Sequence, residues 1–293
     1  MEKHRAGFVN IIGKPNVGKS TLMNALVGEK VSIITSKAQT TRHRIMGIVN
    51  AEDFQIVYSD TPGIMTPGYK LHEKMMEFVK TALIDADIIL FVTDITDPEP
   101  ADEALLKRIN SAKVPVLLLV NKIDLSEQGK LEQKVQEWAK LTPAAEIILV
   151  SALEKFNLSY VFDKIVSLLP LSPPYYDKDE LTDKTQRFFV SEIIREKVLL
   201  IYDKEIPYSV EIAIESFKEE SHITKISAVI LVERDSQKGI LIGHQGKNLK
   251  RLGTDARKDI EAFLNKKVFL ELFVKVDKDW RNNEGKLKHF GYN

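Results

Sequence analysis

The sequence predicts an α/β protein in which a doubly wound, mostly parallel sheet is followed by a small α+β domain. Short apolar runs such as GFVNIIG (7–13) and IILFVTD (88–94) recur through the first 170 residues and alternate with stretches of helical spacing. Such runs are typical of parallel strands buried on both faces. Three Pro then fall within residues 170–174, and beyond them the strands alternate in polarity.

The first domain is expected to contain five strands, and each ends in a polar residue or Gly. The strands are expected over 7–13, 54–60, 88–94, 114–121 and 147–151. Apolar residues at helical spacing predict helices between and after them, for example over 71–83, 131–138 and 162–169. Ligands of doubly wound sheets bind at the carboxyl ends of the strands. The residues that close these runs are therefore the first candidates for a binding site.

The second domain is expected to follow the order α-β-β-α-β. Its elements are a helix over 182–201, strands near 210–214 and 223–234, a loop and helix over 239–265, and a strand over 268–276. The Pro-rich stretch cannot continue the preceding helix. We therefore expect a first domain over 1–172, a linker over 173–181 and a second domain over 182–293.

The composition excludes several classes of protein. The 293 residues include 42 Lys and Arg, 42 Asp and Glu, and no Cys, which rules out disulfide scaffolds, Cys-ligated zinc and thiol nucleophiles. No apolar run approaches the ~20 residues that span a bilayer, and the first residues lack the apolar core of a signal peptide, so a cytoplasmic protein is expected. Residues 221–293 hold 15 basic and 9 acidic side chains, which points to an anionic partner.

A phosphate-binding loop is predicted between the first strand and a helix that starts at Ser20. GKPNVGKS (13–20) fits the pattern GxxxxGK[ST], in which glycines let backbone N–H groups close around phosphate oxygens. Lys19 supplies a positive charge to the β- and γ-phosphates, and the hydroxyl of Ser20 ligates Mg²⁺. Asp60 closes the next strand, where a carboxylate can hold Mg²⁺ through water, and the amide of Gly63 can sense the γ-phosphate.

Two further motifs favour guanine over adenine. NKID (121–124) and SAL (151–153) each end an apolar strand. The carboxylate of Asp124 can accept hydrogen bonds from the ring N–H and the exocyclic amine of guanine, and the backbone of Ser151 and Ala152 can donate to its carbonyl oxygen. The predicted nucleotide site comprises Gly13, Lys14, Pro15, Asn16, Val17, Gly18, Lys19, Ser20, Thr21, Thr40, Thr41, Asp60, Gly63, Asn121, Lys122, Asp124, Ser151, Ala152 and Leu153.

With the variants GKPNVGKS, QTTRHR and DTPGI, the first domain resembles the Era family of translation-factor-class GTPases. The resemblance implies that Thr41, or its neighbour Thr40, is the switch threonine that reaches Mg²⁺, so Ser20, Thr41 and Asp60 are the expected metal ligands. Ile64 stands where Ras-like enzymes carry a water-orienting Gln. In related GTPases without this Gln, an Asn at the position of Asn16 ligates K⁺. Lys19, Thr41 and Asn16 are therefore the expected catalytic residues, and we expect slow intrinsic hydrolysis.

A KH domain is predicted in the second part of the chain. GHQG (243–246) lies in an IGxxG frame that enters a basic helix, and a GxxG loop lets the backbone clamp about four nucleotides of single-stranded nucleic acid. The candidate RNA-binding residues are Gly243, His244, Gln245, Gly246, Lys247, Lys250 and Arg251.

With this second domain, the resemblance to the Era family covers nearly the whole chain. It implies a monomer that binds the 3′ end of small-subunit ribosomal RNA, assists maturation of that subunit, and resides in the cytoplasm with peripheral membrane contact. Two alternatives stay open on the residues alone. One is a GTPase that serves transfer-RNA modification, as in the TrmE group, and the other is a non-enzymatic RNA-binding protein with a structural nucleotide site.

Overall fold

The chain divides into two compact units in a computed structural model that describes residues 4–97, 103–126, 128–143 and 145–292. The longest continuous segment of the second unit begins at Lys184, and the second domain was expected to begin at 182. Two short segments of the expected first domain nevertheless cluster with the second unit. The first unit comprises Met1–Ser32, Thr41–Pro67 and Met75–Asp183, and the second comprises Ile33–Thr40, Gly68–Lys74 and Lys184–Asn293.

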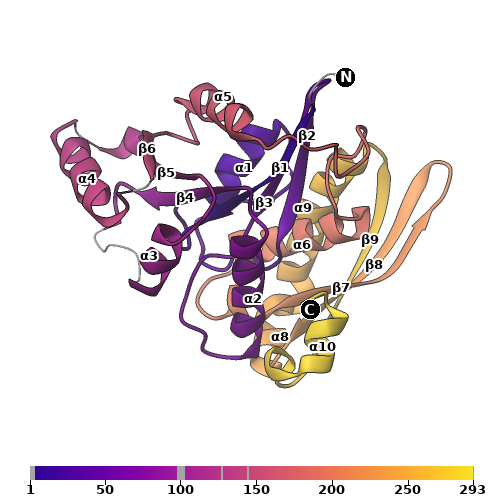
Figure 1. The fold of residues 1–293 in the computed structure, drawn as a ribbon. Helices are drawn as coiled ribbons and strands as arrows, with labels where there is room; N and C mark the ends of the chain where they lie inside the picture. Colours follow the sequence, from indigo (N-terminus) through magenta and orange to yellow (C-terminus); the bar gives the residue numbers. More distant parts are fainter. Residues whose placement is uncertain (1–3, 98–102, 127, 144, 293) are drawn as a thin grey trace. The chain divides into compact units, whose positions relative to one another are not determined.

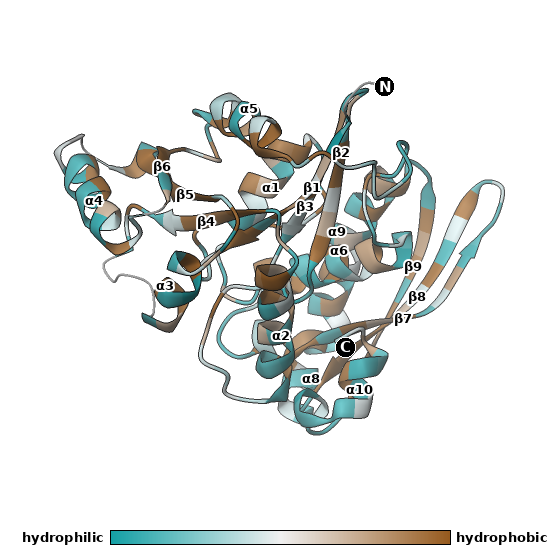
Figure 2. Ribbon diagram, in the orientation of Figure 1, coloured by the Kyte–Doolittle hydropathy of each residue, from teal (hydrophilic) through white to brown (hydrophobic). Residues whose placement is uncertain are grey.

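The first unit is built on a six-stranded sheet of order β2-β3-β1-β4-β5-β6. Every residue of β4 and β5 is buried, as their continuous apolar runs predicted, and both strands are brown over most of their length in Figure 2. Its strands are β1 (Arg5–Ile12), β2 (Ile45–Asn50), β3 (Phe54–Asp60), β4 (Ile88–Asp94), β5 (Val116–Asn121) and β6 (Glu146–Leu149).

Helices cover both faces of this sheet. Helices α1 and α5 lie on one face, and α3 lies on the other (Figure 1). The helices are α1 (Lys19–Val27), α2 (Lys70–Ile84), α3 (Glu103–Asn110), α4 (Gln128–Leu141) and α5 (Leu158–Leu168), with the 3₁₀ helix η1 over Ile123–Leu125. No helix in the described ranges has both the length and the apolar character needed to cross a membrane.

Strand β2 is an element that the apolar runs did not predict. It pairs antiparallel with β3 at the edge of the sheet, whereas the other pairs are parallel. The sequence IMGIVN contains Gly47, which has room only for a hydrogen because a Cβ there would lie 2.8 Å from Met23 Cε and Val27 Cγ2. Pairing with β3 forms the strand although its alternation is weak, and Gly47 lets it lie close to α1.

The stretch 173–181, expected as a linker, packs along β2 and β3. Gln55 is fully buried, and its side chain accepts hydrogen bonds from the N–H groups of Tyr175 (2.7 Å) and Tyr176 (3.0 Å). The N–H of Ile48 donates to the carbonyl oxygen of Leu181 at 2.8 Å. These bonds fix the stretch on the first unit as an ordered extension of it.

The second unit combines a three-stranded sheet of order β7-β8-β9 with helices on one face. Strands β7 and β8 are antiparallel and β8 and β9 are parallel. Apolar residues of α6 and α9, such as Ile194 and Ala256, pack on inward-facing residues of the strands, such as Ala228. The elements are α6 (Gln186–Ile201), α7 (Ile206–Ser209), β7 (Glu211–Glu219), β8 (Ile223–Val232), α8 (Asp235–Ile242), α9 (Lys247–Leu264), β9 (Lys267–Val276) and α10 (Glu284–His289), with 3₁₀ helices η2 (His244–Gly246) and η3 (Trp280–Asn282).

Helix α8 is a correction to the sequence prediction, which treated the residues before the GxxG tetrad as strand and loop. Residues 235–242 are helical, although Gly239 lies in the middle of the segment. Leu241 is fully buried in the core of the unit, and this tertiary packing outweighs the low helix propensity of Gly.

Candidate nucleotide and RNA sites

The conformation of the phosphate loop requires glycine at two positions and favours asparagine at a third. Gly18 has φ +95°, and a Cβ there would lie 2.3 Å from Asn121 Nδ2. A Cβ on Gly13 would lie 2.2 Å from the carbonyl oxygen of Val92. Asn16 has φ 63°, a left-handed conformation that Asn tolerates better than most residues. The loop therefore turns tightly from β1 into the N-terminus of α1, the arrangement in which backbone N–H groups can bind a phosphate.

Lys19 closes this loop. Its ammonium group donates to the carbonyl oxygens of Gly13 (3.1 Å) and Lys14 (2.8 Å). Burial lowers the pKa of Lys19 to about 8, although the charge of Asp60 opposes this shift. The pKa of Asp60 is raised because its carboxylate is buried, and the charge of Lys19 counteracts this. A bound phosphate group would add negative charge beside this buried ammonium.

The three expected metal ligands come together. Ser20 Oγ donates to Asp60 Oδ2 at 2.7 Å and lies 2.9 Å from Thr41 Oγ1, which in turn lies 3.2 Å from the same carboxylate oxygen. The other oxygen, Asp60 Oδ1, is buried and makes no hydrogen bond among the described residues. Two hydroxyls and a carboxylate with an unsatisfied oxygen are the hard oxygen donors that Mg²⁺ prefers. The residues present therefore fit this ion.

The two adjacent threonines point to different partners. Thr40 Oγ1 donates to the carbonyl oxygen of Lys37 at 2.6 Å and lies 2.6 Å from Thr35 Oγ1. Thr41 is the one that reaches Ser20 and Asp60. Adjacent residues of an extended chain point to opposite sides, so the sequence could not decide between the two and the geometry does.

Asn121 connects the phosphate loop to the SAL segment. It ends β5 and is 2% exposed. Its Nδ2 donates to the carbonyl oxygen of Val17 at 2.8 Å, and its Oδ1 accepts from the N–H of Ala152 at 2.9 Å. The Asn121 side chain thus connects the phosphate loop at Val17 to the SAL segment at Ala152. The sequence of the NKID motif alone did not predict this role.

The remaining guanine-site residues surround this bridge. Lys122 has φ 62° and forms an ion pair with Asp94, and Asp124 is exposed in η1 without a partner in the described chain. The N–H of Ser151 donates to the carbonyl oxygen of Phe156 at 3.3 Å. With Ala152 N–H also engaged, the two backbone donors expected for the base are already used. The N–H of Leu153 makes no hydrogen bond within the described residues and is the open donor of this segment.

The other predicted residues of the nucleotide site serve the loop itself. Lys14 pairs with Asp97 at 2.9 Å, and Val17 is buried. Gly63 packs against the loop, since a Cβ there would lie 2.6 Å from Pro15 Cα. Thr21 is half-buried in the first turn of α1, and the exposed Asn16 makes no side-chain hydrogen bond in the part of the chain described.

The GxxG tetrad forms a tight turn between α8 and α9. Gly243 and Gly246 have φ of +69° and +74°, and Gln245 has φ 50°. A Cβ on Gly243 would lie 2.6 Å from Asn248 Cγ, so no side chain fits there. The side chains of His244 and Gln245 are exposed, as are those of Lys247 and Lys250 just beyond the turn. The backbone of the turn is therefore open to a ligand.

A groove of about 550 Å³ runs from this turn between α9 and β9. Arg257 lines it on the helix, and Leu270 and Leu272 line it on the strand. Gly253 lets helix and strand approach, because a Cβ there would lie 3.3 Å from Leu272. Arg251 pairs only loosely with Asp255, at 4.0 Å. Positive charge on one wall and apolar side chains on the other suit an extended nucleic-acid strand.

Sequence comparison matches parts of both units to known families. A family model described as a 50S ribosome-binding GTPase matches residues 8–122, and a KH-domain model matches residues 205–281. The chain is 44% identical over 294 residues to the GTPase Era of Staphylococcus haemolyticus, covering 100% of this chain and 98% of the relative. It is 46% identical over 293 residues to the GTPase Era of Geotalea daltonii, covering 99% of each.

Comparison with solved structures extends the match to the whole fold. A crystal structure of Era in complex with MgGDPNP and nucleotides 1506–1542 of 16S ribosomal RNA matches with a TM-score of 0.94, 39% identity and 99% of both chains covered. A single-residue variant of Aquifex aeolicus Era bound to GDP and AlF4⁻ matches with the same TM-score and identity, over 98% of this chain and 99% of that one.

The chain belongs to the GTPase Era family. The predicted family and fold class are confirmed. As an Era-family member the protein is a GTPase whose second unit is a KH domain.

Sequence reasoning missed several groove residues, namely Leu249, Gly253, Thr254, Leu270 and Leu272. Their apolar or small side chains gave no signal apart from the helix and strand periodicity, which also fits an ordinary core.

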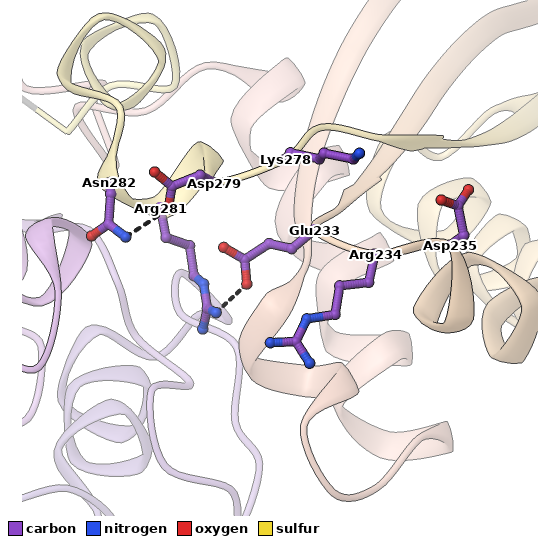
Figure 3. A pocket seen from close by; sticks show the side chains of 7 residues that line it. All are labelled: Glu233, Arg234, Asp235, Lys278, Asp279, Arg281 and Asn282. Carbon is purple, nitrogen blue, oxygen red and sulfur yellow. Dashed lines mark hydrogen bonds and ion pairs between the residues drawn. The ribbon is translucent and has the colours of Figure 1, made fainter.

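A second pocket in the KH unit is balanced in charge. It measures about 530 Å³ and lies where β8 and β9 end (Figure 3). Figure 3 shows the guanidinium groups of Arg234 and Arg281 directed into one opening, where Arg281 pairs with Glu233. Three acidic and three basic residues line it together with Asn282, so it does not favour an anion: Glu233, Asp235, Asp279, Arg234, Lys278 and Arg281. The GxxG groove is therefore the better candidate for the RNA site of this Era-family protein.

Proposed function

We propose that this protein hydrolyses GTP in its first unit, binds the single-stranded 3′ end of small-subunit ribosomal RNA through its KH groove, and assists maturation of that subunit. The convergence of Ser20, Thr41 and Asp60 beside a phosphate loop, in one chain with a GxxG groove, carries the proposal. The full-length likeness to an Era protein in complex with MgGDPNP and 16S ribosomal RNA supports the choice of RNA.

The residues at the phosphate loop take distinct roles in this proposal. Ser20, Thr41 and Asp60 hold Mg²⁺, which when bound neutralises charge on the β- and γ-phosphates. Lys19 moves from its carbonyl partners to the phosphate oxygens, and Gly63 presents its amide near the γ-phosphate. Because Ile64 has no group that could orient water, the chain itself supplies no general base at this point. Intrinsic hydrolysis is therefore slow.

The guanine is recognised at the ends of β5 and β6. Asp124 accepts from the two donors of the guanine edge, and it is exposed and without a partner in the described residues. Asn121 keeps the SAL segment against the phosphate loop, and the open N–H of Leu153 donates to the guanine carbonyl oxygen. Lys122, fixed by Asp94, covers the base from one side.

Asn16 is the proposed ligand of a potassium ion. Its side chain is exposed at the phosphate loop and makes no hydrogen bond within the described residues. Turnover measured in KCl and in NaCl at equal ionic strength tests this role. We expect faster hydrolysis in KCl for the wild type and equal rates for Asn16→Ala. Equal wild-type rates in the two salts would contradict the assignment.

The RNA function is tested by binding a short RNA that copies the 3′ end of small-subunit ribosomal RNA. Affinity is measured at one fixed salt concentration, because phosphate contacts make it salt-dependent, with a non-hydrolysable GTP analogue and with GDP. A scrambled RNA of equal length is the control. Selective binding that differs between the nucleotides supports the proposal. No preference over the scrambled RNA would remove the ribosomal assignment.

The family also implies a monomer that acts in the cytoplasm and contacts the membrane peripherally. Cell fractionation tests the location, and sedimentation tests the oligomeric state. These two expectations are independent of the nucleotide and RNA sites.

A further inference from the structure

Strand β9 carries two half-exposed phenylalanines on the face of the KH sheet that lies away from the helices. Phe269 is 51% exposed and Phe273 is 48% exposed. Val268 and Val274 point the other way, into the core formed with α6 and α9. Successive side chains of a strand alternate between the two faces, so both phenyl rings stand on the same outer face. Strand β9 shows this alternation as bands of colour in Figure 2.

The C-terminal segment covers the end of this outer face that lies beyond Phe273. The hydroxyl of Tyr292, a buried residue, donates to Glu211 Oε2 at 2.9 Å. Glu211 is aligned with Leu231, and Leu231 is aligned with Lys275 on β9. The C-terminal residues therefore lie on the face that carries the phenylalanines, at the end nearer to Phe273, and both rings stay half-exposed.

The two rings lie on the strand that forms one wall of the RNA groove, but on its other face. Leu270 and Leu272, which alternate with them along β9, line the groove beside Gly246 and the basic helix α9. Strand β9 is the last strand in the order β7-β8-β9, so no described strand lies beyond its outer edge. A nucleic-acid strand that leaves the groove can reach the phenyl rings by passing around this open edge.

Lysines lie beside both rings, although acidic residues pair with two of them. Lys267 precedes Phe269 on the same face and makes no ion pair within the described residues, and Lys225 is aligned with Phe269 on β8. Lys225 pairs with Glu220 and Lys275 pairs with Glu215, so Lys267 is the lysine on this face of β9 without an ion pair in the described residues. Glu271 between the rings is the one acidic residue on this face of β9. Exposed rings with neighbouring lysines are typical of surfaces on which single-stranded bases stack while lysines meet phosphates.

The RNA in the solved Era complex is longer than the stretch that a GxxG groove clamps. A GxxG groove clamps about four nucleotides, whereas the solved Era complex contains nucleotides 1506–1542. Four residues along a strand span about 13 Å, so the two rings offer separate stacking positions.

We propose that Phe269 and Phe273 form a stacking platform that extends the RNA-binding surface of the KH unit beyond the GxxG groove, with each ring taking one unpaired base. This inference rests on the proposed RNA-binding function. It deepens that function by assigning the nucleotides that lie outside the four held at the groove.

The test compares two RNAs on the full chain at one salt concentration by fluorescence anisotropy. The short RNA has the four or five nucleotides that fill the groove, and the long RNA extends the same sequence to about ten. The variants are Phe269→Ala, Phe273→Ala and Phe273→Leu, the last of which keeps apolar volume but removes the ring. Leu200→Ala is the control, because Leu200 is a 57% exposed apolar residue of α6.

We expect each Ala variant to bind the long RNA about 5- to 150-fold more weakly, the range for loss of one base–aromatic stack. Phe273→Leu should lose affinity similarly, and Leu200→Ala should change neither RNA. Binding of the short RNA should be unaffected in all variants.

Two results would overturn the platform. Unchanged affinity for the long RNA would show that the rings do not bind its bases. Equal loss for both RNAs would show that the substitutions damage the groove itself. In either case selective binding of the short RNA by the wild type keeps the proposed function, whereas its failure to bind any ribosomal 3′ sequence would remove that function as well.

Discussion

Arg195 in α6 donates a hydrogen bond through Nη2 to the carbonyl oxygen of Thr40. The same guanidinium donates to the carbonyl oxygen of Gln39 at 3.3 Å and pairs with Glu192. Burial alone would lower the pKa of Arg195, but chiefly the carboxylate of Glu192 raises it, so the group stays charged. The segment Ile33–Thr40 belongs to the KH unit through bonds of this kind.

Replacing Arg195 by Ala should destabilise the KH unit. Glu192 is 6% exposed and would lose the positive charge beside its buried carboxylate, which costs about 3–5 kcal/mol. Denaturant unfolding measures the loss, and hydrogen exchange should show faster exchange in residues 33–40. Lys258→Ala removes an exposed cation and serves as the control. A loss below about 1 kcal/mol would show that other groups or water compensate Glu192.

The two switch threonines should differ sharply when each is replaced. Thr41→Ala removes a hydroxyl from the group around Asp60, so the Mg²⁺ concentration for half-maximal hydrolysis should rise at least about 10- to 100-fold, the range for residues that merely support metal ligands. Thr40→Ala is the matched control, because Thr40 bonds Thr35 and Lys37 instead. A Mg²⁺ titration of GTPase activity measures both. Equal effects would contradict the assignment of Thr41.

Two glycine substitutions should have opposite effects. In Gly18→Ala the new Cβ would clash with Asn121 Nδ2, and the alanine would be held at a positive φ. GTP affinity should therefore fall, and the free energy of unfolding should decrease by about 1–3 kcal/mol. In Gly129→Ala the new Cβ would have no heavy atom within 4 Å, and the residue lies in helix α4. The free energy of unfolding should therefore rise by about 0.5–1 kcal/mol. Thermal unfolding and nucleotide titration compare the variants. Normal GTP binding by Gly18→Ala would show that the loop can relax.

Nucleotide binding should depend on pH through Lys19. Its pKa of about 8 lies below the value of 10.5 for an exposed Lys, so the free protein loses this charge as the pH rises through 8. A bound phosphate favours the charged form, and binding near pH 8 should therefore take up a proton. Calorimetry in buffers of different ionisation enthalpy measures this uptake. Its absence, with affinity constant from about pH 7 to 9, would contradict the lowered pKa.

The lowered pKa of Lys19 also makes the free energy of unfolding depend on pH. Between pH 8 and 10.5 the unfolded chain binds more protons at this Lys than the folded chain does, so the cost of burying Lys19 diminishes as the pH rises through this window. Lys19→Met removes the titration and should flatten this part of the stability profile.

Base specificity should depend on Asp124. Asp124→Asn replaces a carboxylate that accepts two hydrogen bonds by an amide that also donates, so GTP binding should weaken by about 2–4 kcal/mol, as for two lost charge-assisted bonds. Xanthosine triphosphate, which presents a carbonyl in place of the amine, should bind this variant better than GTP. Competition binding with both nucleotides measures the switch. Asp163→Asn, on α5, is a control for the change of charge.

Much of this protein could be predicted from the order of its residues. The buried strands β4 and β5 are continuous apolar runs. The segments GKPNVGKS and GHQG form tight turns that need glycine, either for a positive φ or for a close approach to a neighbouring group. Such features depend on a few adjacent residues, so they can be read without knowing what lies next to them.

Other features depended on contacts between distant residues. Helix α8 was missed because its propensity is weak and its burial of Leu241 is not visible in the sequence. The stretch 173–181 is composed like a free linker, yet the buried side chain of Gln55 binds it.

The sequence by itself determined the two-domain organisation, the nucleotide motifs and the GxxG turn, because each depends on residue type and short-range spacing. Only the tertiary structure decided that Thr41 and not Thr40 meets Ser20 and Asp60, and that Asn121 links Val17 to Ala152. It also decided that Phe269 and Phe273 stay exposed. The physical reason is that hydrogen bonds and burial join side chains far apart in the chain, and local spacing does not specify those distances.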